Sequence, residues 1–544
     1  MKEAFWMIDQ LVQQGVNHFC IAPGSRNTPL ALAAAQYPDV NIHVHFDERG
    51  LGFYTMGLAQ GSAAPAAIIA TSGTAVGNLL PSVMEAHHSS VPMILLTADR
   101  PAELRDCGAN QTTDQVKIFQ PFVRWQADLP PTLNEGYFRS MMAQACFHAQ
   151  QNPRGPVQIN CQFREPFQLI GPSLPKGSPI QLSFPKLKPD LSALKPWERF
   201  TKGLILIGRL DSPESLLPIL QLAERLQWPI FADLLTHARC HPTHEQIRHF
   251  DWILKSGCEL KPDMILHFGE RVTSKKTLEW LQELHPCPYL HVDPRPSLLD
   301  PARLQTGRIQ ANASEFCPLF EAKTDPDWLK SWKEWDRQID GTVESFFAEN
   351  PRFTEGHAMR IIGEILPSHY PVFLGNGMPI RDADHFLFPK NSCKGFFVNR
   401  GLTGIDGNIA TAAGLSNGSN APLLAFIGDQ ACLHDLNSFA LLKKTKYPLT
   451  LIVSNNYGSG IFHHLPIVKC PHFEKYWGAA HDWNFEDIAR MFELPYVRTD
   501  SDPREELSDA FQSGKSSVVE IITSRHYNHQ FQMELTERCQ QILV

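Results

Sequence analysis

The chain has 544 residues, of which 43% are hydrophobic, so it can bury several cores, and its length predicts about three or four domains. Its formal net charge is −8 with acidic and basic residues interspersed, which excludes the basic footprint of a nucleic-acid-binding protein. No apolar run reaches the ~20 residues of a membrane-spanning helix, and the first residues lack the apolar core of a signal peptide. We therefore expect a globular, cytoplasmic protein with no membrane span and no nucleic-acid partner.

The first part of the chain reads as an α/β domain. Short β-branched runs alternate with helical patterns, which favours parallel sheets covered by helices. Strands are expected within residues 16–25, 40–50, 65–74 and 91–101. A segment dense in Pro and Lys follows and is typical of a linker. We place the first domain at residues 1–172 and the linker at 173–198.

Two further blocks repeat this pattern. Strands are expected within residues 202–209, 228–235, 263–269 and 288–293, and then within 370–377, 395–401, 421–429, 448–456 and 517–523. We place a central domain at residues 199–325 and a last domain at 326–544. The predicted fold class is α/β, with three doubly wound domains built on mainly parallel sheets.

The cysteines and one histidine-rich segment were considered as crosslinks or metal ligands. The 12 cysteines form no C-x-x-C pair, which predicts reduced thiols rather than a disulfide framework. The densest group of possible ligands is His237, Cys240, His241 and His244 in HARCHPTH. These residues share one Pro-containing stretch, and no second ligand pair follows at zinc-site spacing, so we interpret it as a surface loop.

The stretch from Leu423 to Asn456 carries the first chemical signal. It reads as a buried strand, a helix over residues 432–445 and a second buried strand, which together form one βαβ unit. The carboxyl ends of two such parallel strands lie at the same edge of the sheet. Asp429 and Asn456 are therefore expected side by side, at the edge where open α/β sheets bind ligands.

These residues suit a divalent cation and a phosphate group. Asp429, Asn456 and the backbone carbonyl of Gly458 would form a set of hard oxygen ligands for Mg²⁺ that leaves room for diphosphate oxygens. Gly428 and Gly458 would let the backbone approach a phosphate closely. The simpler alternative is that Asp429 caps its helix while Asn456 makes a turn. Their joint occurrence in one βαβ unit favours the ligand site.

At this point the sequence resembles a known family. GDQ and SNN resemble the diphosphate and Mg²⁺ motif of thiamine-diphosphate (ThDP) enzymes, and the three blocks resemble their pyrimidine-binding, central and diphosphate-binding domains. The closer resemblance is to the 2-succinyl-5-enolpyruvyl-6-hydroxy-3-cyclohexene-1-carboxylate synthases (MenD) of menaquinone biosynthesis. It rests on APGSRNTPL, HFDERGLGF, TSGTAVGNLLPSVMEA, LLTADRPAELRDCGANQTTDQ, GNGMPIRDAD, NRGLTGIDGN and NNYGSGIF, and it runs from Ile21 to Phe492.

The resemblance implies a transferase with a defined reaction. Such an enzyme uses thiamine diphosphate and Mg²⁺, with Mn²⁺ as a possible substitute. It decarboxylates 2-oxoglutarate and adds the succinyl-semialdehyde carbanion in a 1,4 sense to isochorismate. The cofactor would lie between two subunits, so the resemblance implies a homodimer or homotetramer. A different ThDP-dependent 2-oxo acid carboligase or decarboxylase is the alternative, and Glu48 with the metal ligands disfavours a non-catalytic descendant.

The resemblance also assigns roles to residues. Glu48 would hydrogen-bond the cofactor's aminopyrimidine, which promotes loss of the thiazolium proton, while Asn110 and Gln111 would supply polar contacts near the reacting centre. Ile405 would be the apolar wedge that bends the cofactor. The full set of cofactor contacts is Glu48, Thr74, Gly377, Ile405, Gly428, Asp429, Asn456, Ile461 and Phe462.

Cations are expected for the two anionic substrates, since the guanidinium fork of Arg matches a carboxylate. Ser25, Arg26, Arg100 and Gln111 would face isochorismate by resemblance. Arg381 and Arg400 would hold the part derived from 2-oxoglutarate. Lys275 and Lys276 in the central domain resemble a basic pair of the family. Gly377, where the family often has Ser, and Lys276, where it can have Arg, depart from the family pattern.

Overall fold

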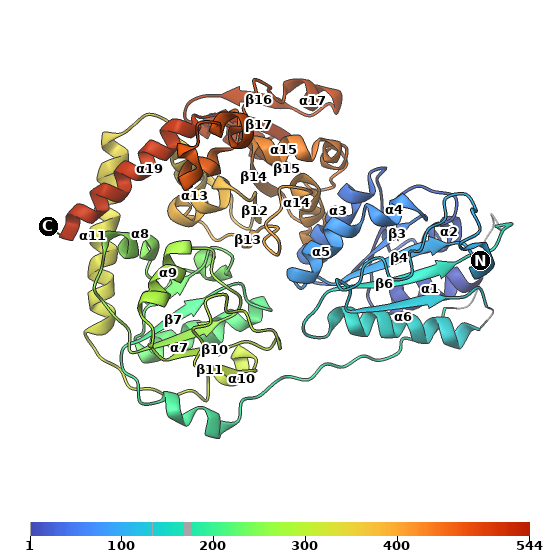
Figure 1. Ribbon diagram of the computed structural model, residues 1–544, viewed down its shortest axis with the longest axis horizontal. Coiled ribbons are helices and arrows are strands. Elements are labelled where there is room, and N and C mark those ends of the chain that lie inside the picture. The colour runs from blue at the N-terminus through green and yellow to red at the C-terminus, as the bar shows by residue number, and fades with distance from the viewer. Residues whose placement is uncertain (1, 133, 168–175, 544) are drawn as a thin grey trace.

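The computed structural model describes residues 2–132, 134–167 and 176–543, and three sheets covered by helices organise this part of the chain (Figure 1). All strand pairs that form the three sheets are parallel. The predicted fold class is therefore confirmed. The predicted boundary between residues 172 and 173 lies outside the described residues, and the domain limits remain predictions. No helix in the described part of the chain is long and apolar enough to span a membrane.

The first sheet has the strand order β2-β1-β3-β4-β6-β5, so its winding direction reverses between β1 and β3. Its domain contains α1 (Lys2–Gln13), β1 (His18–Ile21), α2 (Thr28–Ala34), β2 (Asn41–Val44), α3 (Glu48–Ser62), β3 (Ala66–Ala70), α4 (Thr74–Gly77), α5 (Leu80–His88), β4 (Met93–Asp99), β5 (Trp125–Leu129), α6 (Glu135–Gln150) and β6 (Pro156–Gln162). The four expected strands are β1 to β4. Sequence reasoning missed β5 and β6.

β6 was missed because buried polar residues interrupt its apolar pattern. Gln158 and Asn160 are fully buried in this strand, and Gln158 Nε2 donates to the carbonyl of Gln115 at 2.8 Å, while its Oε1 has no hydrogen-bond partner among the described residues. Asn160 Nδ2 donates to Asp99 Oδ2 at 2.9 Å and to Asp128 Oδ1 at 2.8 Å. Buried polar side chains that are largely hydrogen-bonded are tolerated in a core, but they do not show in a hydrophobicity pattern.

The second sheet, in the central domain, has the order β11-β10-β9-β7-β8. Its elements are β7 (Gly203–Ile207), α7 (Leu216–Leu226), β8 (Ile230–Ala232), α8 (Phe250–Ser256), β9 (Met264–Phe268), α9 (Lys275–Glu283), β10 (Tyr289–Val292), β11 (Gly307–Ile309) and α10 (Ala313–Phe316). The segment leading to this domain is anchored on it, because Leu187 N donates to Asn312 Oδ1 at 2.8 Å. Figure 1 shows this segment as an extended connection between the first and central domains.

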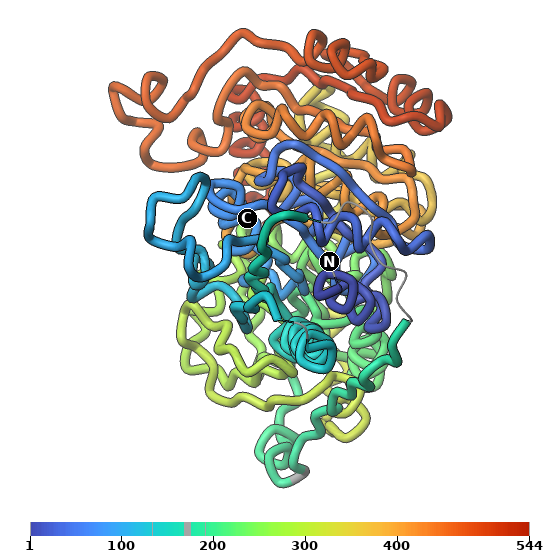
Figure 2. Tube along the Cα trace, turned by 90° about the vertical axis from the view of Figure 1, so that its right-hand side faces the viewer, coloured from blue at the N-terminus to red at the C-terminus, as the bar shows by residue number. Residues whose placement is uncertain are grey.

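The third sheet has the order β13-β12-β14-β15-β17-β16, with a reversal between β12 and β14. Its domain contains α11 (Trp328–Glu349), α12 (Glu355–Ile365), β12 (Val372–Leu374), α13 (Met378–Phe386), β13 (Phe396–Phe397), α14 (Asn408–Ser419), β14 (Leu423–Gly428), α15 (Asp429–His434), α16 (Phe439–Lys443), β15 (Leu449–Asn455), α17 (Glu486–Met491), β16 (Tyr496–Thr499), α18 (Arg504–Gln512), β17 (Ser517–Ile522) and α19 (Arg525–Gln540). Figure 2 shows this domain at one end of the molecule and the central domain at the other.

The prediction of a single helix over residues 432–445 is wrong in detail. The structure has two short helices, α15 and α16, separated by a 3₁₀ turn. Asp435 at the break is fully buried and accepts hydrogen bonds from Ser438 Oγ at 2.8 Å and from the backbone N–H of Ala410 in α14 at 3.1 Å. The carboxylate thus caps a neighbouring helix, and this tertiary contact overrides the local helical pattern.

The first and third domains meet through α3 and α14, which lie side by side in Figure 1. Glycines on both helices make the contact possible. A Cβ atom at Gly57 would lie 2.1 Å from the carbonyl oxygen of Thr411, and one at Gly414 would lie 2.1 Å from that of Tyr54. The contacts of Gly61 with Leu415 and of Gly418 with Leu58 repeat this pattern one turn later. The two helices are therefore parallel, and their backbones touch along what we call the glycine seam.

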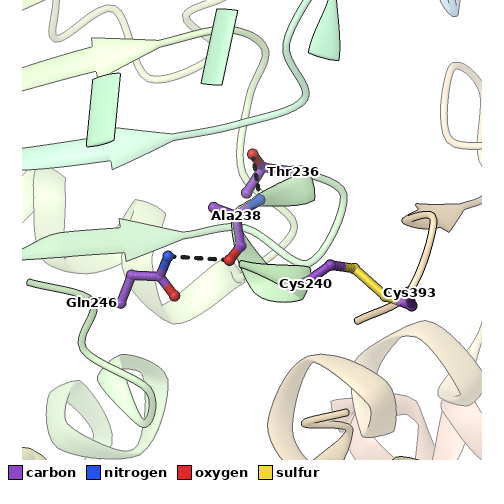
Figure 3. Close-up of a disulfide and its surroundings, with 5 residues drawn as sticks. All are labelled: Thr236, Ala238, Cys240, Gln246 and Cys393. Atoms are coloured by element: carbon purple, nitrogen blue, oxygen red, sulfur yellow. Dashed lines mark hydrogen bonds between the residues drawn. A yellow bond between two sulfur atoms is a disulfide. The ribbon is translucent and has the colours of Figure 1, made fainter. Parts of the chain in front are cut away.

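A disulfide between Cys240 and Cys393 joins the central and third domains (Figure 3). The two residues are 153 positions apart in sequence, and their Cα atoms are 5.5 Å apart. The prediction of reduced thiols is therefore wrong for this pair, because sequence spacing does not show which cysteines the fold brings together. The other ten cysteines carry free thiols.

The disulfide also changes the interpretation of HARCHPTH. His241 and His244 are exposed, as expected for a surface loop. The preceding residues His237–Cys240 instead form a 3₁₀ helix that buries Cys240. Next to the crosslink, Arg239 forms a 2.8 Å ion pair with Asp384 of the third domain, and both side chains are almost fully buried.

Candidate active site

The carboxyl edge of the third sheet brings together the residues expected to bind a metal ion. β14 and β15 are neighbours in this sheet, and Gly428 pairs with Ser454 at their ends. Asp429 begins α15 directly after β14, and its side chain is almost fully buried. Its Oδ2 accepts a 2.9 Å hydrogen bond from the backbone N–H of Gly458. Asp429 is therefore joined to the loop that follows β15, as the βαβ pattern predicts.

Among the described residues, the side-chain amide of Asn456 has a hydrogen-bond partner at its nitrogen but none at its oxygen. Its Nδ2 donates to Glu355 Oε1 at 2.8 Å, and its Oδ1 is buried with no hydrogen-bond partner among the described residues. The same Glu355 oxygen also accepts from Ser454 Oγ at 3.1 Å and from Thr523 Oγ1 at 3.0 Å. Glu355, at the start of α12, thereby fixes the orientation of the amide. Nothing in the sequence pattern had pointed to Glu355.

This arrangement fits a hard divalent cation. A buried polar atom without a partner is costly, and a cation would satisfy the Asn456 oxygen. The carboxylate of Asp429 supplies a negative charge beside it, which is the ligand chemistry that Mg²⁺ prefers. Space for a phosphate is present as well, because a Cβ atom at Gly428 would meet no atom within 4 Å.

Arg381 and Arg400 form a pair of cations on the same side of the third sheet. Arg400 Nη1 donates to Asn376 Oδ1 at 3.2 Å, and Arg381 Nη1 donates to the carbonyl of Gly377. Burial, followed by the nearby charge of Arg381, lowers the pKa of Arg400 to about 10. No carboxylate oxygen of the described residues lies within 4.0 Å of either guanidinium. Two partly desolvated cations without a counter-ion are suited to a ligand that carries carboxylates.

Gly377 lies at the start of α13 with a φ of 95°. This positive φ favours glycine over residues with a side chain. Glycine at this position, where the family often has Ser, is thus compatible with the local backbone.

A second pair of cations lies in the first domain, where Arg26 follows β1 and Arg100 follows β4. The side chain of Arg100 donates to Ser72 Oγ and, at 2.7 Å, to the carbonyl of Gln111. Burial lowers the pKa of Arg100, and the charge of Arg26 is the next contribution, so the two guanidinium groups are close. Arg26 is not free, since it pairs with the exposed Glu165 at 2.7 Å.

The smaller polar residues predicted near this pair belong to the same domain. Gln111 Nε2 donates to the carbonyl of Ser72 at 2.9 Å. Ser25 and Asn110 precede Arg26 and Gln111 in the chain, Thr74 begins α4, and all three residues are exposed. The first domain thus carries the side chains assigned to one substrate, and also Asn110 and Thr74, which were assigned to the reacting centre and the cofactor.

Glu48 contacts a residue of its own domain rather than the metal-site residues of the third sheet. It is the first residue of α3 rather than the end of a strand, because β2 already ends at Val44 and Asp47 caps the helix. Its carboxylate accepts a 3.4 Å hydrogen bond from Asn78 of the same domain. Beside it, β2 is an edge strand, and the apolar side chains of Ile42, Val44 and Phe46 are exposed.

The remaining predicted site residues lie in other segments of the third and central domains. Ile405 is 40% exposed in the loop before α14, and Ile461 and Phe462 are partly buried in the 3₁₀ helix η7 (Gly460–His464). Lys275 and Lys276 begin α9 and pair with glutamates of their own helix. From the same domain, Arg271 Nη2 instead donates to the carbonyl of Arg400 at 3.4 Å. Arg271 was not predicted.

Comparisons with known proteins identify the domains that carry these residues. Three family models match: the N-terminal TPP binding domain of thiamine pyrophosphate enzymes over residues 1–118, the middle domain of thiamine pyrophosphate enzymes over 187–374, and the C-terminal TPP binding domain over 376–521.

Similar proteins include several named 2-succinyl-5-enolpyruvyl-6-hydroxy-3-cyclohexene-1-carboxylate synthase. The protein of Salinibacter ruber is 37% identical, with 96% of this chain and 94% of that protein covered. The protein of Rubrobacter xylanophilus is 36% identical, covering 97% of this chain and 96% of that protein. The protein of Bacillus pumilus is 34% identical, with coverage of 96% and 94%.

Proposed function

The chain belongs to the 2-succinyl-5-enolpyruvyl-6-hydroxy-3-cyclohexene-1-carboxylate synthase family of ThDP-dependent transferases, and from this membership we propose that its substrates are 2-oxoglutarate and isochorismate. The enzyme releases CO₂ from 2-oxoglutarate and joins the remaining four-carbon unit to isochorismate by 1,4-addition. This reaction would serve menaquinone biosynthesis, and we place it in the cytoplasm.

The observation that carries the substrate assignment is the cation pair of Arg381 and Arg400. After decarboxylation, the 2-oxoglutarate skeleton keeps a carboxylate at its far end. Two partly buried guanidinium groups that form no ion pair with any described carboxylate suit that group. A 2-oxo monocarboxylate such as pyruvate would leave these cations without a counter-ion, at a cost typical of unpaired buried charges.

Cofactor and metal would be held mainly at the carboxyl edge of the third sheet. Asp429, Asn456 and the carbonyl of Gly458 would hold Mg²⁺, or Mn²⁺ in its place, and Gly428 would leave room for the diphosphate. Thiamine diphosphate supplies the carbon nucleophile that allows a 2-oxo acid to lose CO₂. The other cofactor contacts that we propose are Thr74, Gly377, Ile405, Ile461 and Phe462.

Glu48 would complete the site from a second subunit. Its role is to hold a proton between its carboxyl group and the cofactor's aminopyrimidine, which promotes formation of the reactive carbon. The exposed apolar side chains of β2 next to Glu48 support association of two copies there, because such side chains on an edge strand favour a partner. We therefore propose a homodimer or homotetramer.

Isochorismate would bind at the first-domain cations. Arg26 and Arg100 pair with its carboxylates, and Ser25, Asn110 and Gln111 hydrogen-bond its polar groups. Lys275 and Lys276 would add positive charge from the central domain.

The direct test is to mix the pure protein with thiamine diphosphate, Mg²⁺, 2-oxoglutarate and isochorismate, and to identify the product by mass. We expect the named synthase product and one CO₂ per turnover. A parallel reaction with pyruvate in place of 2-oxoglutarate is the control. Equal turnover of pyruvate would contradict the assignment and would make the protein another ThDP-dependent 2-oxo acid carboligase or decarboxylase.

A further inference from the structure

A second group of metal-ligand side chains lies outside the site described above. His463 belongs to η7, Glu474 begins the π-helix η9 (Glu474–Gly478), and His526 lies in the first turn of α19. One ligand atom from each residue lies within 4.8 Å of the other two. Glu474 Oε1 is 4.0 Å from Nε2 of each histidine. Three segments that are distant in sequence thus place two imidazoles around one carboxylate oxygen.

His463 is the residue that sets this group apart from an ordinary surface cluster. It is 3% exposed, and neither of its ring nitrogens makes a hydrogen bond of good geometry among the described residues; its polar neighbours are the backbone of Ser459 and the carboxylate of Glu474. The ring packs edge-on against Phe473 and His526, with centroid distances of 4.9 and 4.6 Å. A buried imidazole normally satisfies at least one nitrogen, so these nitrogens call for an unseen partner.

Glu474 is oriented for such a partner. Arg525 Nη2 donates to Glu474 Oε2 at 2.8 Å, and Arg525 Nη1 donates to the carbonyl of Gly478 at 2.8 Å. One carboxylate oxygen is therefore held by Arg525, and the other, Oε1, faces the two histidines. Hydrogen bonds that orient a ligating carboxylate in this way are a regular feature of metal sites.

The site is also open to solution. His463, Glu474 and His526 line a cavity of about 430 Å³, together with Cys470 and His472. An ion could enter from this side and complete its coordination with water.

We propose that His463, Glu474 and His526 bind one transition-metal ion of the Zn²⁺ type. Two imidazoles and one carboxylate form a known zinc ligand set that keeps one position open. The two nitrogen ligands disfavour Mg²⁺, which prefers oxygen, so this ion would differ from the one at Asp429.

The ion would connect the loop beside the cofactor site to α19. This loop runs from Gly458 to His481, and its two ends are already joined, since Ser459 N donates to the carbonyl of Gly478 at 2.8 Å. At its far end, His481 Nε2 lies 3.2 Å from Asp429 Oδ2. A bound ion would tie the middle of the loop, through His463 and Glu474, to the helix that carries His526.

The test uses Co²⁺ as a spectroscopic substitute for Zn²⁺. The full-length protein is freed of metal and then saturated with Mg²⁺ and thiamine diphosphate, so that the site at Asp429 is filled. Titration with Co²⁺ should give one equivalent per chain, with the visible absorption of a four- or five-coordinate ion. Zn²⁺ should displace it, and added Mg²⁺ should not.

Variants assign the signal to these residues. We expect His526→Ala and Glu474→Gln each to weaken Co²⁺ binding at least tenfold. Losing only a hydrogen-bond partner of a metal ligand already weakens metal binding by about tenfold or more, and these two residues would be ligands themselves. His526 is 70% exposed, so its loss should leave the fold intact. His529→Ala is the matched control, because His529 lies one turn further along α19 and contacts His464 instead. This control should bind Co²⁺ like the wild type.

Two results would overturn the proposal. One is unchanged Co²⁺ affinity in both His526→Ala and Glu474→Gln. The other is a signal that disappears in Asp429→Ala, which would mean that Co²⁺ reports the cofactor-site metal.

Discussion

Glu355 holds the side-chain amide of Asn456 by a 2.8 Å hydrogen bond, and the amide oxygen of Asn456 is left buried without a partner. The pair therefore presents an acceptor that no other described residue satisfies and that a bound cation would. Asp429 supplies the matching negative charge from the neighbouring strand end.

The first prediction concerns this metal site. Asp429→Ala should abolish binding of thiamine diphosphate in the presence of Mg²⁺, because the remaining amide and carbonyl oxygens carry no charge. Calorimetric titration measures the affinity, and circular dichroism checks the fold. Asp487→Ala, which removes an exposed acid of α17, is the control and should bind like the wild type. Wild-type affinity in Asp429→Ala would refute the metal assignment.

A second prediction separates cofactor binding from activation. Glu48→Gln keeps the size and hydrogen-bonding capacity of the side chain but cannot hold the acidic proton that the aminopyrimidine needs. The variant should bind thiamine diphosphate with wild-type affinity, while exchange of the cofactor's C2 proton slows by at least tenfold. NMR after rapid mixing with D₂O and quenching follows this exchange. An unchanged exchange rate would mean that Glu48 has another role.

The two cation pairs should fail at different steps of the reaction. Loss of one partner of a desolvated charged contact costs about 2 to 5 kcal/mol. Arg400→Ala should therefore slow CO₂ release from 2-oxoglutarate even when isochorismate is absent. Arg100→Ala should release CO₂ at the wild-type rate and then transfer the four-carbon unit poorly.

Single-turnover measurement of CO₂ and of product follows each step separately. If both variants lose only CO₂ release, or both lose only transfer, the assignment of one substrate to each cation pair is wrong.

Asp435 gives a prediction for the dependence of stability on pH. Its complete burial raises the pKa of the carboxyl group to about 6, above the value of about 3.9 in an unfolded chain. The folded state then favours the protonated form, so this contribution to stability is present below pH ~4 and is lost as the pH rises through ~6. The shift of roughly two pKa units corresponds to about 3 kcal/mol.

Asp435→Asn tests this effect, since asparagine stays neutral and its oxygen can still accept from Ala410. Urea unfolding of both proteins should show the variant gaining about 3 kcal/mol relative to the wild type between pH 4 and pH 7. A difference that stays constant over this range would show that Asp435 does not titrate in it.

The disulfide predicts a thiol count. Of the 12 cysteines, two are joined as Cys240–Cys393, so 12 − 2 = 10 thiols should react in denaturant without reductant, and 12 after reduction. Cys240→Ser with Cys393→Ser should lower the free energy of unfolding by about 2 to 4 kcal/mol, because a long loop is no longer closed in the unfolded state. Twelve reactive thiols before reduction would contradict the crosslink.

The sequence predicted the site best where the order of parallel strands alone determines which residues are neighbours. Asp429 could be placed beside the loop of Asn456 because the ends of neighbouring parallel strands must share an edge. Gly377 and Arg400 were assigned to the site by family resemblance alone. The structure adds that the Arg400 and Arg381 side chains lie close together.

Contacts between segments far apart in the chain could not be predicted in the same way. Glu355 orients Asn456 across 101 positions, and Cys240 pairs with Cys393 across 153. β6 was hidden by buried polar residues whose partners lie on other strands. Each of these depends on tertiary packing, which leaves no periodic signal in the local sequence.

The glycine seam has a consequence for how the enzyme moves. The four glycines of this seam, Gly57 and Gly61 in α3 and Gly414 and Gly418 in α14, each lie against a carbonyl of the opposite helix, so a slide by one residue would drive a side chain into backbone. Shear between packed helices, one of the two common types of domain closure, is therefore blocked at this contact. We expect the first and third domains of a subunit to keep one relative position through the catalytic cycle. Opening and closing around substrates would then fall to loops at the sheet edges, such as the one that follows Asn456.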